Sequence, residues 1–196
     1  MKKTLLVLLL LGAGMYLSAQ ENPFGFGVAS LDVAVSDDVP IGDYAALSAD
    51  NLGGSVRVNF AVDQVPFLMP YLQLDNTWWL GSPSFVSWGT QINALMGMSA
   101  YYPLPLEGLG TLRLGGGIGY GLMLHLASAD TTGSGAALKV FVDQALAATL
   151  EFRLDLNNTP FSVLLTPRYL FSPEASGQVH QAGVQLGVAY SLNQKN

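Results

Sequence analysis

Eight charged side chains occupy positions where polar and apolar residues alternate along the chain. Successive side chains of a strand point to opposite faces, so these charges would share a face opposite the Leu, Val and Ile residues. An isolated buried charge is unfavourable, so we expect acidic and basic members to pair inside the fold. The set comprises Arg57, Asp75, Arg113, Lys139, Asp143, Glu151, Arg153 and Arg168. We predict a structural network that fills an interior; a gate or a polar ligand contact is the alternative.

Metal and cofactor chemistry has little support. The chain has no cysteine and two histidines, His125 and His180, so disulfides, thiolate sites and histidine clusters are excluded. Four glycines alternate from Gly115 to Gly121, but their spacing does not match a dinucleotide fingerprint. We expect these glycines to make room for Glu151, Arg153 and Phe141, with a ligand side cavity as the alternative. We therefore predict no catalytic, cofactor or metal residues.

An acidic stretch follows the first apolar segment. Asp37, Asp38, Asp43 and Asp50 fall in a predicted loop, with Asp32 just before it. Several carboxylates could bind calcium, which prefers oxygen ligands. The spacing matches no helix–loop–helix calcium motif, so a solvated loop is the expected structure.

The elements that would position these residues are strands. Alternation over short segments separated by turn residues predicts eight of them. Their approximate ranges are Phe24–Val35, Gly53–Val62, Phe67–Leu80, Val86–Tyr102, Thr111–His125, Ala137–Leu154, Phe161–Phe171 and Ala182–Asn196. Helical periodicity is absent from these segments.

Composition decides what surrounds such strands. Charged residues make up 11% of the chain and apolar residues 50%, whereas soluble domains carry about 25% charge. After residue 20 no apolar run is long enough for a membrane helix. A transmembrane β-barrel satisfies both facts, because alternate residues face lipid. The net charge of −6 offers no basic patch for nucleic acid.

The N-terminal residues resemble a secretory signal peptide. Lys2 and Lys3 precede an apolar run that begins at Leu5, and Ala19 is the expected cleavage position. We therefore divide the chain into a signal peptide, residues 1–19, and one barrel domain, residues 20–196.

An even number of strands places both ends of the barrel on one side, which we expect to be the periplasm. Short connectors at Asp63–Pro66, Pro103–Gly110 and Asp155–Pro160 would be periplasmic turns. The external loops would be Ser36–Leu52, Gly81–Phe85, Leu126–Ala136 and Ser172–Gln178. Aromatic residues gather near both expected interfaces, as in membrane barrels. They are Phe24, Phe60, Tyr102, Phe152, Phe161 and Tyr190 on the periplasmic side, and Trp78, Trp79, Trp88 and Phe171 outside.

The last strand carries a further pattern. Gln185, Gly187, Tyr190 and Leu192 resemble the C-terminal assembly signal of bacterial outer-membrane barrels. Together with the signal peptide, the eight strands and the aromatic girdles, this resembles small outer-membrane barrels of the OmpA/OmpW type. The resemblance implies an integral, porin-like outer-membrane protein that contacts lipid and the barrel-assembly machinery. Its OmpW-like branch implies passage of small hydrophobic solutes, and its OmpA-like branch implies a plugged structural barrel.

We therefore expect a non-enzymatic barrel that is structural or forms a narrow passage. Two alternatives remain. One is a lipid-modifying barrel enzyme, for which His125 or His180 with Ser128 or Ser172 would supply a histidine–serine pair. The other is a soluble secreted barrel that binds a ligand, which would turn its apolar faces inward.

Overall fold

A computed structural model of the chain describes residues 25–42, 45, 48–80, 86–129, 137–173 and 178–192. Eight strands form the described part: β1 Phe26–Ile41, β2 Asp50–Val62, β3 Leu68–Leu80, β4 Val86–Leu106, β5 Gly110–Ala129, β6 Ala137–Leu156, β7 Phe161–Pro173 and β8 Gln178–Ser191. Within this part no helix is long and apolar enough to cross a membrane. The predicted signal peptide and Phe24 lie outside the described residues.

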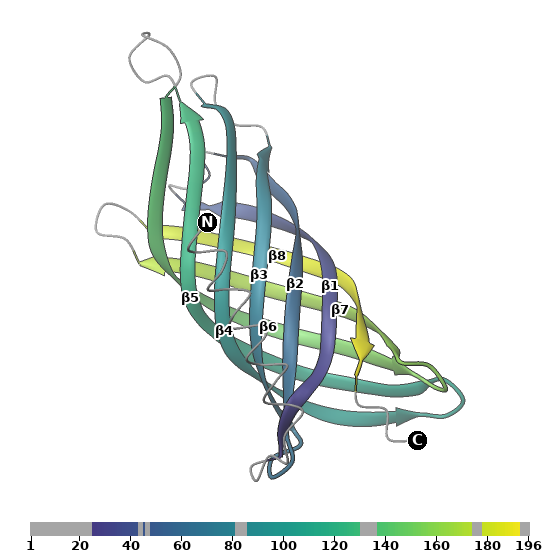
Figure 1. Cartoon of the computed structure of the whole chain (residues 1–196). Helices are drawn as coiled ribbons and strands as arrows, with labels where there is room; N and C mark the ends of the chain where they lie inside the picture. The colour runs from purple at the N-terminus through teal and green to yellow at the C-terminus, as the bar shows by residue number, and fades with distance from the viewer. Residues whose placement is uncertain are drawn as a thin grey trace.

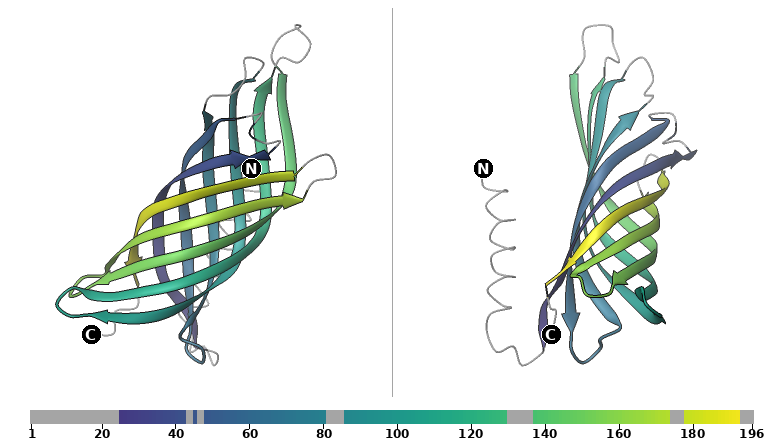
Figure 2. Two further views of the ribbon diagram at one scale, coloured as in Figure 1. Left: turned by 180° about the vertical axis from the view of Figure 1, so that it is seen from behind. Right: turned by 90° about the vertical axis from the view of Figure 1, so that its right-hand side faces the viewer.

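The eight strands close into an antiparallel up-and-down barrel, as predicted. Each strand pairs with its neighbour in the chain, and β1 pairs with β8 from Ser30 opposite Ser191 to Ile41 opposite His180. Front and back strands cross at a steep angle, which gives the barrel its twisted outline (Figures 1 and 2). Three tight connections, at 63–67, 107–109 and 157–160, define what we call the turn end. The opposite end, where β1, β3, β5 and β7 finish, is the loop end.

The barrel is polar inside and apolar outside. Asn59, Asp75, Gln91 and Glu151 are buried, whereas Ile118 and Leu150 are 72% and 61% exposed. This follows from strict alternation, because directly paired residues of adjacent strands share a face. A soluble barrel needs the reverse arrangement, so that alternative is wrong. The outward apolar surface is the one that a bilayer covers.

Aromatic residues lie on the outer surface near both ends. At the turn end Phe26 stacks on Phe60 with ring centroids 5.0 Å apart, and Phe161 meets Tyr190 edge-on at 5.5 Å. Trp78 and Trp88 are exposed near the loop end. Trp79 was expected in the same girdle but is buried inside the barrel, because neighbours in a strand face opposite sides.

Several strands run further than the sequence pattern predicted. β1 continues through Asp37 and Asp38, so the acidic loop begins later than expected. β4 extends through two prolines to Leu106, which reduces the predicted turn Pro103–Gly110 to residues 107–109. β8 begins at Gln178 and ends at Ser191, which leaves Leu192 just beyond it. Proline at strand ends does not stop pairing when its position needs no ladder donor.

The loop end is uneven. β5 and β6 pair along their whole length, from Gly110 opposite Leu156 to Ala129 opposite Ala137. The pairing of β6 with β7 reaches only Leu146 opposite Phe171. A hairpin of β5 and β6 therefore projects past the end of the β7–β8 hairpin (Figure 1).

Candidate functional site: a filled lumen, an outer groove and a projecting hairpin

The interior contains ion pairs that connect opposite walls. Arg57 on β2 donates to Glu151 on β6 over 2.9 Å, although these strands are not neighbours. Glu151 also accepts hydrogen bonds from the hydroxyls of Ser99, Thr149 and Tyr101. Arg57 Nε donates to Asn59 Oδ1 at 2.8 Å. A carboxylate with four donors is well satisfied for a buried charge.

A second group of charges closes the turn end. Arg153 lies 3.6 Å from Asp32 and donates to Asp155 over 3.0 Å. Arg113 donates to the other oxygen of Asp155 over 2.6 Å. Asp155 was predicted in a turn, but it belongs to β6 and acts as the shared acceptor of two arginines. These side chains line a recess of about 290 Å³ at this end of the lumen, beside Ser30 and Ser162.

Arg168 on β7 is the centre of the third group. Its Nε is 2.7 Å from one oxygen of Asp38, and its Nη2 contacts the other oxygen. Its Nη1 is 2.7 Å from Asp75 Oδ2, while Gln73 donates to Asp75 Oδ1 at 2.8 Å. All three charged side chains are buried. This two-sided pairing joins β7 to β1 and to β3 across the lumen.

Apolar side chains fill the remaining interior towards the loop end. Met123 and Leu170 are completely buried and pack in one cluster with Trp79, Leu95, Ala127, Ala145, Ala147 and Val179. A pair of glutamine side chains, Gln91 and Gln181, exchanges hydrogen bonds of 3.1 and 2.6 Å across the barrel. An eight-stranded barrel is just wide enough for side chains to fill it. Here they do so with both polar and apolar groups.

Six of the eight predicted network residues belong to the ion-pair groups, and Asp143 and Lys139 do not. Arg57, Glu151, Arg153, Arg113, Arg168 and Asp75 form the three groups above. Asp143 lies apart, with Oδ2 3.8 Å from Nε2 of His125. Lys139 was expected in the network and does not belong to it: the residue is exposed on the projecting hairpin, where β7 is no longer present to enclose a lumen.

Several lumen residues were not predicted from the sequence. Asp32 and Asp38 are the most important, since each neutralises a buried arginine. The sequence pattern could have placed both aspartates in the lumen, because Ser30, Asp32, Ser36 and Asp38 continue the alternation of the first strand. Tyr101 also faces inward and contacts Glu151, but an inward tyrosine has no distinctive sequence pattern.

The inward glycines make room for side chains, and one of the three predicted neighbours, Glu151, is among them. A Cβ on Gly117 would lie 2.7 Å from Glu151 Oε1, and one on Gly115 would lie 2.7 Å from Cδ1 of Tyr101. Gly119 accommodates the hydroxyl of Tyr71. Arg153 and Phe141 are not the neighbours that these glycines accommodate. The glycine row is therefore filled, which leaves the ligand side cavity without support.

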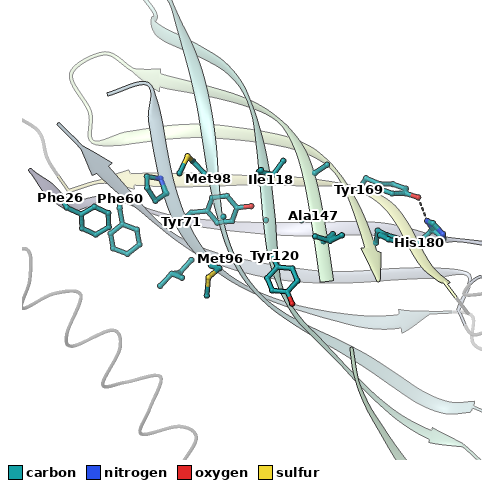
Figure 3. Close-up of a pocket in the computed structure, with 17 residues that line it drawn as sticks. Phe26, Phe60, Tyr71, Met96, Met98, Ile118, Tyr120, Ala147, Tyr169 and His180 are labelled. Atoms are coloured by element: carbon teal, nitrogen blue, oxygen red, sulfur yellow. Dashed lines mark hydrogen bonds between the residues drawn. The ribbon is translucent and has the colours of Figure 1, made fainter. Parts of the chain in front are cut away.

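A long apolar groove crosses the outer face of the barrel. It has a volume of about 1140 Å³ and runs across the strands from Phe26 and Phe60 to Tyr169 and His180 (Figure 3). Methionine, isoleucine and tyrosine side chains line its middle. Tyr71 reaches it from inside, at the position where the wall is thinned by Gly97 and Gly119. Only the end near His180 is polar, where this residue and Tyr169 share a hydrogen bond.

Neither histidine forms the predicted pair with a serine. His125 is buried in the interior near Trp79, with ring centroids 6.0 Å apart. Ser128 pairs with the exposed Trp88 and Leu138 and therefore faces outward. The second pair is reversed, because Ser172 is buried inside while His180 lies in the outer groove. Each histidine therefore faces away from the candidate serine nearest to it in sequence. His125 and Ser172 both face the interior, but Ser172 Oγ has no hydrogen-bond partner among the described residues.

The predicted assembly signal is distributed over both faces of β8. Gln185 is buried, and Gly187 lies so close to β1 that a Cβ would be 2.6 Å from the Cβ of Ala34. Tyr190 and Leu192 are exposed on the outside. The amide of Leu192 donates to the carbonyl of Ala29 over 2.9 Å, which continues the closure of the barrel one residue past β8.

The acidic stretch does not form the predicted solvated loop. Asp38 forms an ion pair with Arg168 inside the barrel, and Asp37 and Asp50 belong to strands. Asp43 lies outside the described residues. Among the residues that the structure describes, no three acidic or histidine side chains are grouped as a metal site.

The chain matches no protein-family model, and no curated protein is detectably similar to it in sequence. Solved structures are similar in fold. Ail of Yersinia pestis aligns with a TM-score of 0.52 at 15% identity, over 86% of this chain and 99% of that chain. Neisserial surface protein A gives 0.49 at 16% identity over 86% and 97%. The N-terminal β-barrel domain of Pseudomonas aeruginosa OprF gives 0.45 at 15% identity over 83% and 98%.

At such identities the likeness concerns the fold alone. The fold is that of small outer-membrane β-barrels with eight strands, the architecture predicted from the sequence.

Proposed function

We propose that this protein is an integral outer-membrane barrel that is closed and non-enzymatic, and that it displays its loop end at the cell surface. The observation that carries the proposal is the filled lumen. Salt bridges connect opposite walls at two levels, through Arg57 with Glu151 and through Arg168 with Asp38 and Asp75. The apolar cluster around Met123 and Leu170 fills the interior above them.

The charges of the lumen favour a structural role. Four arginines face five carboxylates, Asp32, Asp38, Asp75, Glu151 and Asp155, so the charge is almost balanced. A charged lining that attracted ions would leave one sign in excess. Breaking any of these pairs to open a path would leave a buried charge without its partner, which is strongly unfavourable.

The proposed surroundings follow from the outer face. Lipid would cover the apolar exterior, including the groove. The barrel-assembly machinery would recognise the last strand through Gln185, Gly187, Tyr190 and Leu192. The turn end would face the periplasm with both ends of the barrel, and the loop end would face outward, because short connections are typical of the periplasmic side.

Two measurements, made one after the other, test this proposal. Outer membranes run on a denaturing gel with and without boiling should show a mobility shift, because intact barrels resist cold detergent. Purified, folded protein should then give no steady conductance in planar bilayers and no solute-dependent swelling of liposomes. A large, steady conductance would refute the closed lumen, and recovery from the soluble periplasm would refute the membrane location.

The second candidate function is narrow passage of a small hydrophobic solute. Its specific support is the outer groove, where Tyr71, an interior residue, is reached from the lipid side. Uptake of an apolar fluorescent probe into vesicles would have to depend on the protein and fall on Ala148→Phe, which adds bulk to the exposed wall of the groove. Equal uptake by protein-free vesicles would remove this candidate.

A further inference from the structure

The projecting part of β6 has one edge that no described strand covers. Residues Ala137 to Ala145 pair with β5 on one side, from Ala129 back to Gly121. On the other side no described strand pairs with them, since the β7 ladder begins at Leu146. Alternate residues of a strand direct their N–H and C=O groups to each edge, so this stretch of about 30 Å offers unpaired groups. Such an edge is a template for another strand.

Both faces of this edge segment carry exposed apolar side chains. Leu138, Val140 and Val142 project from the outer face and are each at least half exposed. Phe141 projects from the opposite face and is 56% exposed. Lipid could cover only the outer face, so the exposure of Phe141 needs another explanation. Exposed apolar residues on both faces of an uncovered edge are typical of an interaction surface.

The segment is complementary to itself. Around Phe141 its residues read Ala-Leu-Lys-Val-Phe-Val-Asp-Gln-Ala. When two copies run antiparallel and centre on Phe141, each residue faces its mirror position and the faces match. Lys139 then lies opposite Asp143 of the second copy, and Val140 lies opposite Val142. The two phenylalanines meet at the two-fold axis, where an aromatic cross-strand pair is favourable.

Both charged side chains of this segment are accessible to a further ion pair. Lys139 forms no ion pair or hydrogen bond with any described residue and is exposed. The Asp143 side chain is 21% exposed, and its buried Oδ2 lies 3.8 Å from Nε2 of His125. An antiparallel second copy would place Lys139 beside the exposed part of Asp143 at two symmetric positions. Other strands could satisfy the free backbone groups, but only a copy of this segment explains the mirrored charges.

We propose that the β6 edge, residues 137–145, binds the same edge of a second copy of this chain. The product is a continuous six-stranded sheet made of β4, β5 and β6 from each copy, with an isologous interface. Because antiparallel β6 strands point in opposite directions, the barrels meet loop end to loop end. With the loop end outside the cell, which rests on the proposed function, the two copies lie in facing membranes and hold two cells together.

The register is tested with single cysteines, because the native chain has none. Paired residues of antiparallel strands have Cα atoms about 4.5–5.5 Å apart, within reach of a disulfide. In detergent under mild oxidation, Phe141→Cys should form a disulfide-linked homodimer. Val140→Cys and Val142→Cys should each dimerise poorly alone, since identical positions are then about 8 Å apart. A mixture of these two variants should form the heterodimer.

The charges are tested by complementation. Lys139→Asp gives an all-acidic edge and Asp143→Lys an all-basic one, so each should lower self-association about tenfold or more. Mixing the two variants should restore association, because each then supplies the charge that the other lacks. The double exchange Lys139→Asp with Asp143→Lys should behave like the native protein. Boiling-dependent gel mobility confirms that every variant is folded.

The outcomes separate the two proposals. Equal disulfide formation by all three single cysteines would indicate parallel pairing, and no formation by any would indicate a different occupant; either result overturns self-pairing. For cells, strains expressing Lys139→Asp and Asp143→Lys should aggregate only when mixed. If the purified variants complement but the cells do not, the edge pairing stands and the outward orientation of the loop end is refuted.

Discussion

The ring of Tyr71 fills the space that a side chain at Gly97 would require. A Cβ on Gly97 would lie 2.5 Å from both Cζ and Oη of Tyr71. Gly119, which pairs directly with Gly97, has the same relation to the hydroxyl. A tyrosine from β3 thus lies across two further strands, with the Arg57 guanidinium 3.8 Å from its ring centroid. The glycines permit a large inward side chain in a narrow lumen.

This arrangement predicts a compensating pair of substitutions. Gly119→Ala should destabilise the barrel by about 1–2 kcal/mol, because the new methyl overlaps the Tyr71 hydroxyl. Tyr71→Phe removes the overlapping atom, and the next neighbour of that methyl, Ala147 Cβ, is at an ordinary 3.5 Å. The double variant should therefore be clearly more stable than the sum of the single effects predicts. Urea titration of folded barrels in lipid vesicles, read by gel mobility, measures all three.

Gly97→Ala is the matched control. Its methyl would overlap the backbone oxygen of Ile118 as well as Tyr71, and the backbone cannot give way. Tyr71→Phe should leave this destabilisation largely unchanged. Equal rescue at both glycines would mean that the tyrosine is displaced from the position described.

Leu150 and Glu151 lie on opposite faces of β6, so substitutions at them should lower the stability of the barrel for different reasons. Leu150→Arg puts a charge on the lipid-facing surface and should destabilise by about 2–4 kcal/mol near the bilayer midplane. The sequence pattern alone predicts that Glu151→Gln leaves membrane insertion nearly intact, since residue 151 faces away from lipid. The structure adds an effect on stability, because Gln would leave Arg57 without its carboxylate, a loss of about 3–5 kcal/mol for a buried pair. Both variants should still insert, and urea titration should show lower midpoints for each.

Alternation was sufficient to predict the number of strands and the face of most residues. Val56, Val58 and Phe60 face lipid while Arg57 and Asn59 face the lumen, because a two-residue period leaves only two assignments per strand. Since one face must meet lipid, the apolar set determines which assignment holds.

What the sequence could not show depends on register and strand length. Asp38 joins Arg168 because β1 runs past the acidic residues that resemble a loop. Lys139 has the same alternation as Arg153 on the same strand, yet β7 encloses only the second of them. Pairing partners across a lumen follow from the stagger of all eight strands, which no local pattern contains.

The absence of a histidine–serine hydrogen bond among the described residues predicts that the histidines have no catalytic role. A strain in which His125→Ala and His180→Ala replace the native residues should keep its outer-membrane lipid composition, because Ser172 Oγ has no hydrogen-bond partner in the described part of the chain and His180 Nδ1 is bonded to Tyr169. Mass spectrometry of extracted lipids provides the measurement. The matched control is a deletion strain, and a lipid change shared by both strains would restore the enzyme hypothesis.

Arg168 provides the strongest test of the plugged lumen. Arg168→Met removes the only ion-pair partner that the described residues provide for Asp38 and Asp75, both fully buried, and should destabilise the barrel by about 3–5 kcal/mol. Combining it with Asp38→Asn and Asp75→Asn removes the uncompensated charges and should recover most of that loss, because neutral groups of similar shape tolerate burial better than unpaired carboxylates. Arg168→Lys should fall between these variants, since an ammonium cannot reproduce the two-pronged contact with Asp38. Urea midpoints in vesicles rank the series, and a triple variant no more stable than Arg168→Met would show that the arginine stabilises the barrel by packing rather than by neutralising these two aspartates.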